Sequence, residues 1–180
     1  MAHDIFISYA SGDKHFADAV CTVLEQAGIP CWMAPRDILP SASWGEAIVD
    51  AIYHSKLQLV IFSAKANASP QVTREVERAV NRGVPILPFR VEDVTPTKAL
   101  EYFLAVPHWL DAVTPPFEQH IDKLLATVAQ LFGTEVTSRS ADEGETPKKV
   151  RGPFLEVPPQ EWARPRSRFL NVLRDIFEDR

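Results

Sequence analysis

Residues 57–91, LQLVIFSAKANASPQVTREVERAVNRGVPILPFRV, decide the fold class. The apolar run at 57–62 predicts a buried strand, and the run at 84–91 predicts another. Between them Ser69–Pro70 predicts a helix start, because serine accepts hydrogen bonds from unpaired amides and proline fits the first helical position. Gly83 ends this helix, whose apolar face comprises Val72, Val76, Ala79 and Val80. Two strands joined in this way are predicted to be parallel, because parallel strands need a long crossover.

The same alternation continues on both sides of this unit. Further strands are predicted at 5–7, 29–32 and 106–109, and further helices at 16–27, 44–52, 98–103 and 117–132. Ser43 and Glu46 have the spacing of a capping box at the start of one helix. The predicted fold is therefore an α/β three-layer fold, with a five-stranded parallel sheet between helices. Ligands of such folds bind at the carboxyl ends of the strands.

Charge and composition divide the 180 residues into three parts. Residues 1–133 carry 10 Lys and Arg and 15 Asp and Glu, and their length suits one domain. Residues 134–152 are polar and turn-rich, which predicts a flexible linker. Residues 153–180 are predicted to hold an amphipathic helix, which docks either on a protein partner or on its own domain.

The composition also excludes several classes of protein. A net charge of −5 argues against a nucleic-acid coat protein, and no apolar run approaches the roughly 20 residues of a membrane span. The five histidines share no metal-ligand spacing with each other or with Cys21 and Cys31. Two cysteines among apolar neighbours predict a reduced, cytoplasmic protein. From the charge, the apolar runs and the histidine spacing together, we expect no nucleic-acid, membrane or metal partner.

Four segments in this order resemble the bacterial branch of the Toll/interleukin-1 receptor (TIR) family. They are DIFISY at 4–9, CWMAPRDI at 31–38, the helix from Trp44, and SPQVTREVERA at 69–79. The resemblance covers about residues 3–132 and implies a flavodoxin-like fold. It also implies self-association with other TIR domains in immune or stress signalling. Enzymes of this family cleave NAD, as a substrate rather than a bound cofactor, between nicotinamide and ribose.

The resemblance identifies Glu75 as the catalytic carboxylate. The family pattern is Trp-x-x-x-Glu, and Gln71 stands here in place of the tryptophan, within reach of the same ligand. From the residues alone, the alternative is a solvated glutamate paired with Arg78 or Arg82. Helical periodicity also does not choose between Glu75 and Glu77.

Five more residues are expected to bind substrate by the same resemblance, and each has a simpler alternative. Trp44 would flank the nicotinamide, or else belong to the core. Tyr9 and Ser11 would contact the nucleotide, or else serve only as turn residues. Arg36 and Asp37 lie in the segment that corresponds to the family's BB loop, which gates the pocket and mediates assembly; otherwise they form a solvated pair.

One carboxylate suffices for this chemistry, because nicotinamide in NAD is already a cationic leaving group. The first rival function is a non-enzymatic TIR adaptor that acts through TIR–TIR contact, which Gln71 favours. A flavin-binding protein would use the hydroxyl-rich loop at 8–13. A phosphorelay receiver lacks its acidic pair here, and a nucleoside-processing transferase would also use one glutamate.

Overall fold

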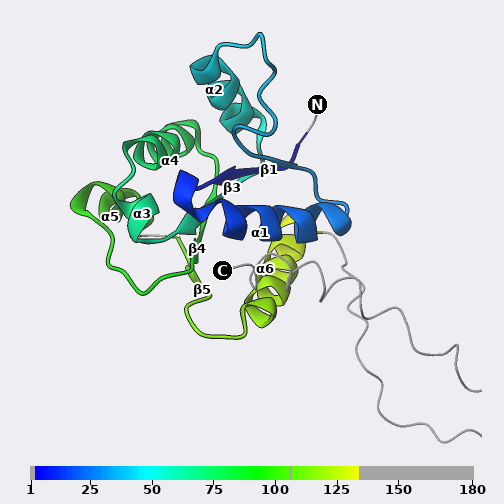
Figure 1. Cartoon of the computed structure of the whole chain (residues 1–180), viewed down its shortest axis with the longest axis vertical. Helices are drawn as coiled ribbons and strands as arrows, with labels where there is room; N and C mark the ends of the chain where they lie inside the picture. The colour runs from blue at the N-terminus through cyan, green and yellow to red at the C-terminus, as the bar shows by residue number, and fades with distance from the viewer. Residues whose placement is uncertain (1–2, 106, 134–180) are drawn as a thin grey trace, which may run out of the picture. The chain divides into compact units, whose positions relative to one another are not determined.

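The computed structural model of the chain describes residues 3–105 and 107–133. The predicted linker at 134–152 and the tail helix predicted within 153–180 lie outside the described residues. The elements, in chain order, are β1 (Ile5–Ser8), η1 (Ser11–Asp13), α1 (Lys14–Gln26), β2 (Cys31–Trp32), α2 (Trp44–His54), β3 (Leu57–Phe62), α3 (Ala64–Asn67), α4 (Pro70–Arg82), β4 (Ile86–Arg90), α5 (Lys98–Leu104), β5 (Leu110–Asp111) and α6 (Phe117–Phe132) (Figure 1).

The five strands form one parallel sheet in the order β2-β1-β3-β4-β5. This is the flavodoxin-like order, whose topological switch point lies between β1 and β3. The α/β fold predicted from the sequence is therefore confirmed. Every residue of β1 and β3 is buried, as expected for strands covered on both faces.

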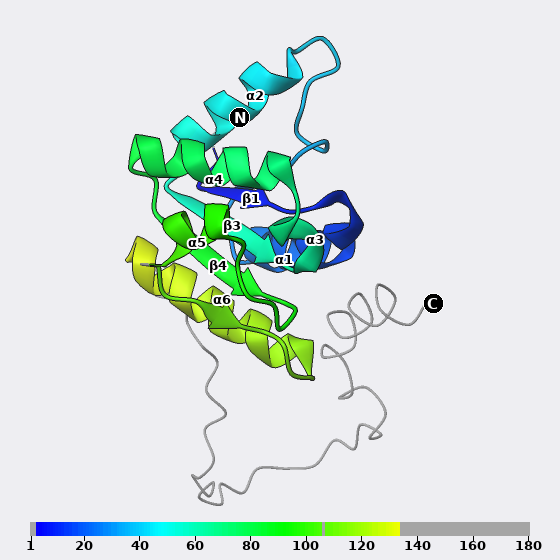
Figure 2. The same ribbon diagram turned by 90° about the vertical axis from the view of Figure 1, so that its left-hand side faces the viewer.

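Helices cover the two faces of the sheet in separate groups. α1 and α6 pack on one face, where Leu24, Leu124 and Val128 contact alternate residues of β1 and β3. α2 and α4 pack on the other face through Ile52 and Ala79. Figure 2 shows α2 beside α4 on that side. Side chains from alternate positions of one strand therefore reach different helix layers.

The ends of α4 follow the local chemistry of its sequence. The Ser69 hydroxyl accepts a hydrogen bond from the Val72 amide at 3.3 Å, and Pro70 occupies the first turn. Gly83 ends the helix with φ of 72°, a backbone conformation that costs glycine little. Both predicted ends of this helix are confirmed.

Four details of the prediction are wrong. The strand expected at 106–109 is replaced by β5 at Leu110–Asp111, because the Trp109 indole instead packs edge-on against Phe62. Ser43 precedes α2, but its side chain makes no capping hydrogen bond. Val80 is 41% exposed rather than buried with the apolar face of α4. The sequence also gave no sign of the short helix α3, which the Ser63 side chain caps.

Candidate functional site

Glu75 is a buried carboxylate on the second turn of α4, with only 6% of its surface exposed. It lies one helical turn after Gln71, on the side of α4 that faces α2 and the end of β1. The Ser8 hydroxyl donates a hydrogen bond to Glu75 Oε2, and Gln71 Nε2 donates to Oε1 at 3.1 Å. Glu77, two positions along the same helix, is exposed.

The surroundings of Glu75 act on its pKa in opposite directions. Burial raises the pKa, because it penalises the charged form, while the hydrogen bonds from Ser8 and Gln71 lower it. The net direction is upward. A buried carboxyl group with a raised pKa and specific hydrogen-bond donors is typical of functional sites. Because Glu75 is buried and its partners are Ser8 and Gln71, the alternative of a solvated glutamate paired with Arg78 or Arg82 is wrong.

A cavity of about 290 Å³ lies between α2 and α4, and Glu75 forms part of its wall. The lining residues from α2 are Trp44, Gly45, Ile48, Val49 and Ile52, and those from α4 are Gln71, Arg74, Glu75 and Arg78. The α2 wall is therefore mainly apolar, and the α4 wall carries the charged and amide groups.

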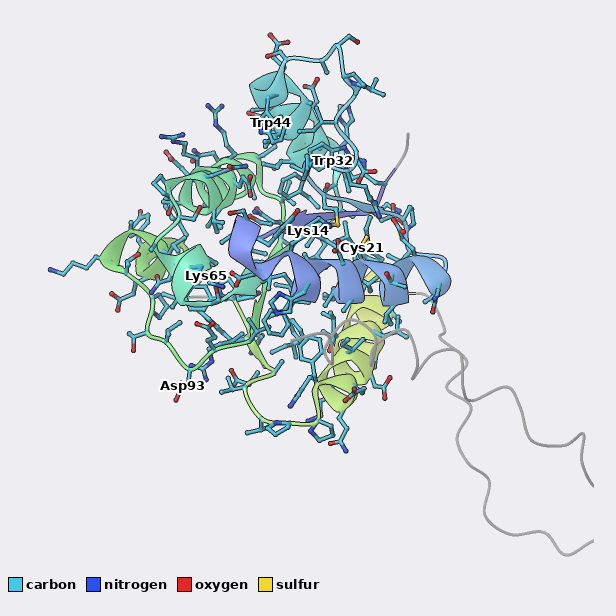
Figure 3. All side chains as sticks on the ribbon, in the orientation of Figure 1. Lys14, Cys21, Trp32, Trp44, Lys65 and Asp93 are labelled. Atoms are coloured by element: carbon cyan, nitrogen blue, oxygen red, sulfur yellow. The ribbon has the colours of Figure 1, made fainter. Side chains whose placement is uncertain are left out.

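Trp44 stands at the first position of α2 and is 51% exposed, so the alternative that placed it in the core is wrong. Figure 3 shows its place on α2. The structure brings three predicted site residues together around this one cavity: Trp44, Gln71 and Glu75.

Tyr9 and Ser11 follow β1 but do not line the cavity. The Tyr9 hydroxyl donates a hydrogen bond to the carbonyl oxygen of Ala34, and burial raises the pKa of Tyr9. Ser11 begins η1 and is exposed. Tyr9 thus attaches the end of β1 to the segment that leads from β2 to α2.

That segment, residues 33–43, is called here the β2–α2 loop. Arg36 attaches this loop to α1 and β2. Its Nη2 contacts Glu25 Oε1 of α1 and the Cys31 carbonyl oxygen of β2, both at 2.8 Å, and its Nη1 contacts Cys21 Sγ of α1 at 3.0 Å. Asp37 accepts a hydrogen bond from the Met33 amide at 2.9 Å. Neither Arg36 nor Asp37 lines the cavity. Their predicted contact with substrate stays a prediction.

A second buried carboxylate stabilises the same edge of the sheet. Asp13 is 1% exposed and accepts a hydrogen bond from the Ser63 hydroxyl at 2.5 Å. Lys65 Nζ lies 3.6 Å from its other oxygen. Because Asp13 follows β1 and Ser63 follows β3, these contacts join the loops on both sides of the switch point.

Sequence reasoning missed three residues of the site: Ser8, Arg74 and Arg78. Ser8 had a detectable signal, since it is the only polar residue of its strand and points to the same face as Phe6. Arg74 and Arg78 had none, because charged residues on an exposed helix face are common.

Residues 3–105 and 107–133 contain neither a candidate metal site nor a candidate membrane-spanning helix. No group of His, Cys, Asp or Glu side chains there is arranged to hold a metal ion. Within the same residues, no helix has the length and apolar character needed to cross a membrane.

Comparison with known proteins shows to which family this chain is similar. The model of the TIR domain matches residues 5–125. No curated protein matches the chain. Three solved structures illustrate the similarity in fold.

The TIR domain of the Toll-related receptor TRR-2 from Hydra magnipapillata is 22% identical with a TM-score of 0.60, over 71% of this chain and 98% of that one. The TIR domains of the activated Roq1 resistosome, which recognises the pathogen effector XopQ, are 16% identical with a TM-score of 0.62, over 70% and 99%. A TIR-STING receptor from C. gigas, in complex with 2′,3′-cGAMP, is 25% identical with a TM-score of 0.56, over 71% and 40%.

The family model spans well over half of the 180 residues. This chain belongs to the TIR-domain family.

Proposed function

We propose that this protein cleaves NAD at the bond between nicotinamide and ribose, with Glu75 as the catalytic carboxylate. The observation that carries the proposal is the placement of Glu75. It is a buried carboxylate, held by Ser8 and Gln71, in the wall of a cavity that has an exposed tryptophan at its other side. This arrangement supplies the two things that the reaction needs, a fixed negative charge and an aromatic surface.

The reaction begins when the bond between ribose C1′ and the nicotinamide nitrogen breaks and the electron pair leaves with nicotinamide. No general acid is needed, because the departing ring is cationic before cleavage and neutral afterwards. The ribose becomes an oxocarbenium-like cation, which a preorganised carboxylate stabilises in a site of low polarity. Water then attacks C1′ and loses a proton, which gives ADP-ribose; attack by a nitrogen of the adenine gives a cyclic product.

Glu75 has the hydrogen-bonding capacity for this role. An ionised carboxylate has about four lone-pair positions, of which Ser8 and Gln71 occupy two. The others are available to ribose hydroxyl groups. Trp44 contributes a face for the nicotinamide ring, because a cation is attracted to the face of an indole by about 0.5–2 kcal/mol.

A second candidate function rests on Gln71. The family's aromatic residue at this position is replaced by an amide that donates to Glu75. A cavity with one aromatic wall fewer favours a non-enzymatic adaptor that signals through TIR–TIR contact. Under either function we propose self-association with other TIR domains, in the cytoplasm, as part of immune or stress signalling.

The experiment follows loss of NAD and release of nicotinamide by the full chain, at high protein concentration with a crowding agent. Glu75→Gln is the test variant. Glu77→Gln is the matched control, because Glu77 is an exposed carboxylate on the same helix. Light scattering reports assembly in each sample.

We expect nicotinamide release by the wild type and the control, and loss of at least about a hundredfold in Glu75→Gln. Release that survives in Glu75→Gln would overturn the assignment of Glu75. No release from an assembled wild-type sample would favour the adaptor.

A further inference from the structure

Two arginines on the cavity wall have side chains without a partner among residues 3–105 and 107–133. Arg74 and Arg78 line the cavity from α4, and neither forms an ion pair or hydrogen bond with another residue in 3–105 or 107–133. The other arginines in those ranges all have partners. Arg36 contacts Glu25 and Asp37, Arg90 contacts Asp111, and Arg82 lies over the Tyr53 ring at 4.4 Å.

The spacing of these two side chains is set by the helix. Residues four apart on an α-helix lie one above the other, about 6 Å apart along the axis. Gln71, Arg74, Glu75 and Arg78 therefore share one face of α4, and the carboxylate lies between the two guanidinium groups in sequence. Both arginines are exposed, so they keep their mobility and their hydrogen-bond donors for a ligand.

We propose that Arg74 and Arg78 bind the 5′-phosphate of the ribose that Glu75 holds, and that they make the site selective for nucleotides over nucleosides. The proposal rests on the proposed function and specifies its substrate class. In NAD the diphosphate is attached at C5′ of the same ribose that carries nicotinamide at C1′. A ribose against Glu75 thus places its phosphate within the length of one helical turn, where the arginines lie.

The chemistry of the groups supports this assignment. A guanidinium group offers paired N–H donors that match phosphate oxygens, and such charge-assisted bonds are stronger than neutral ones. The chain carries a net charge of −5, and NAD is itself an anion, so without local positive charge the domain repels this substrate. Arg74 and Arg78 supply two positive charges on the wall of the cavity, for the phosphate end of such a ligand.

The test compares two ligands that differ only in the phosphate, nicotinamide mononucleotide and nicotinamide riboside. Their dissociation constants are measured by calorimetry on the full chain carrying Glu75→Gln, which prevents turnover. The same measurement is made after adding Arg74→Gln with Arg78→Gln. Arg82→Gln is the matched control, since Arg82 is on the same helix, outside the cavity lining and stacked on Tyr53.

We expect the mononucleotide to bind at least about tenfold more tightly than the riboside, a difference that salt reduces. The double arginine variant should abolish this difference, and Arg82→Gln should retain it. The proposal is overturned if the dissociation constants of the two ligands are equal, or if neither ligand binds. It is also overturned if Arg82→Gln has the same effect as the double variant, or if the double variant alters only assembly in light scattering.

Turnover measurements separate this proposal from the function on which it rests. With Glu75 intact, Arg74→Gln with Arg78→Gln should raise the KM for NAD at least about tenfold while kcat changes much less. Nicotinamide release with an unchanged KM overturns the phosphate site and leaves the enzyme standing. Arginine-dependent binding of the mononucleotide by a protein that releases no nicotinamide supports the phosphate site and contradicts the catalytic function.

Discussion

The Ser8 hydroxyl donates a hydrogen bond to the Glu75 carboxylate, joining the last residue of β1 to the second turn of α4 across 67 positions of sequence. This contact fixes the carboxylate at the carboxyl edge of the sheet. It also opposes the effect of burial, because a donated hydrogen bond stabilises the ionised form. Ser8 therefore both positions Glu75 and helps keep it charged.

Removal of this hydroxyl is predicted to change the pH dependence of the proposed NAD cleavage. In Ser8→Ala the Glu75 carboxylate loses one of its two donors, so its pKa should rise further above the ordinary value. The acidic limb of kcat/KM against pH should then move to higher pH. Near neutral pH the loss should be about tenfold, and activity should recover partly as pH rises.

The matched control is Ser55→Ala, since Ser55 is a buried serine whose hydroxyl donates instead to the Ala51 carbonyl oxygen. It should leave the pH profile in place. An unchanged acidic limb in Ser8→Ala would mean that the Ser8 bond does not tune Glu75.

Burial of Glu75 should also cost the fold stability at neutral pH. Because the pKa of Glu75 is raised in the folded state, the folded protein binds more protons than the unfolded chain between the two pKa values. The contribution of Glu75 is therefore most favourable below the ordinary glutamate pKa of about 4.3, and it is lost as pH rises through the folded value. Glu75→Gln should accordingly be more stable than the wild type at pH 7, with the difference shrinking toward acidic pH.

Thermal unfolding from pH 4 to pH 8 measures this effect. Each kcal/mol corresponds to roughly 4 °C in Tm for a domain of this size. Glu77→Gln is the control and should follow the wild-type curve, because Glu77 is exposed. A Glu75→Gln protein that is less stable than wild type at pH 7 would show that the hydrogen bonds outweigh the burial penalty.

Trp44 is predicted to act on ligand binding with only a moderate effect on stability. The side chain is 51% exposed, so Trp44→Ala removes only about half of the surface that a core tryptophan buries and should lower the free energy of unfolding by no more than about 2 kcal/mol. The affinity for NAD, measured in the Glu75→Gln background, should fall about threefold to thirtyfold.

Trp44→Phe retains an aromatic face and should restore part of that affinity. It should also remove most of the tryptophan fluorescence change expected on addition of NAD, since among Trp32, Trp44 and Trp109, the tryptophans of the described residues, Trp44 alone lines the cavity. Equal affinity in the alanine variant and the wild type would exclude a stacking role.

The fold was predictable from the sequence because its strongest signals are local. An apolar run such as 57–62 by itself indicates a strand that is buried on both faces. Ser69–Pro70 and Gly83 by themselves fix the ends of α4 through backbone geometry. Errors arose where a long-range contact decides the outcome. Trp109 leaves the strand pattern because its ring packs on Phe62 and its indole nitrogen donates to the Leu104 carbonyl oxygen at 3.0 Å.

The site was less predictable, because its defining contacts join distant segments. The resemblance indicated Glu75, but the helix pattern alone could not separate it from Glu77. What separates them is the Ser8 hydroxyl at the end of β1, which donates a hydrogen bond to Glu75, and the cavity that α4 forms with α2. Arg74 and Arg78 are ordinary helix-surface residues until α2 packs beside them.

Arg36 is predicted to hold the β2–α2 loop to the domain. Its guanidinium group contacts Glu25, the Cys31 carbonyl oxygen and Cys21 Sγ. The side chain is 39% exposed, so solvent screening weakens the ion pair, and the hydrogen bonds to less exposed groups carry most of the effect. Arg36→Ala should lower the free energy of unfolding by about 1–2 kcal/mol and make residues 33–43 easier to cleave.

Urea denaturation and limited proteolysis by thermolysin measure these two effects. Lys14→Ala is the control, because Lys14 forms an exposed ion pair with Asp18 and should change stability by no more than about 0.5 kcal/mol. Arg36→Lys should not restore wild-type behaviour, since a single ammonium group lacks the fork that bridges α1 and β2. If Arg36→Ala matches Lys14→Ala in both assays, the loop is held by the Tyr9 contact to Ala34 instead, and Tyr9→Phe should then release it.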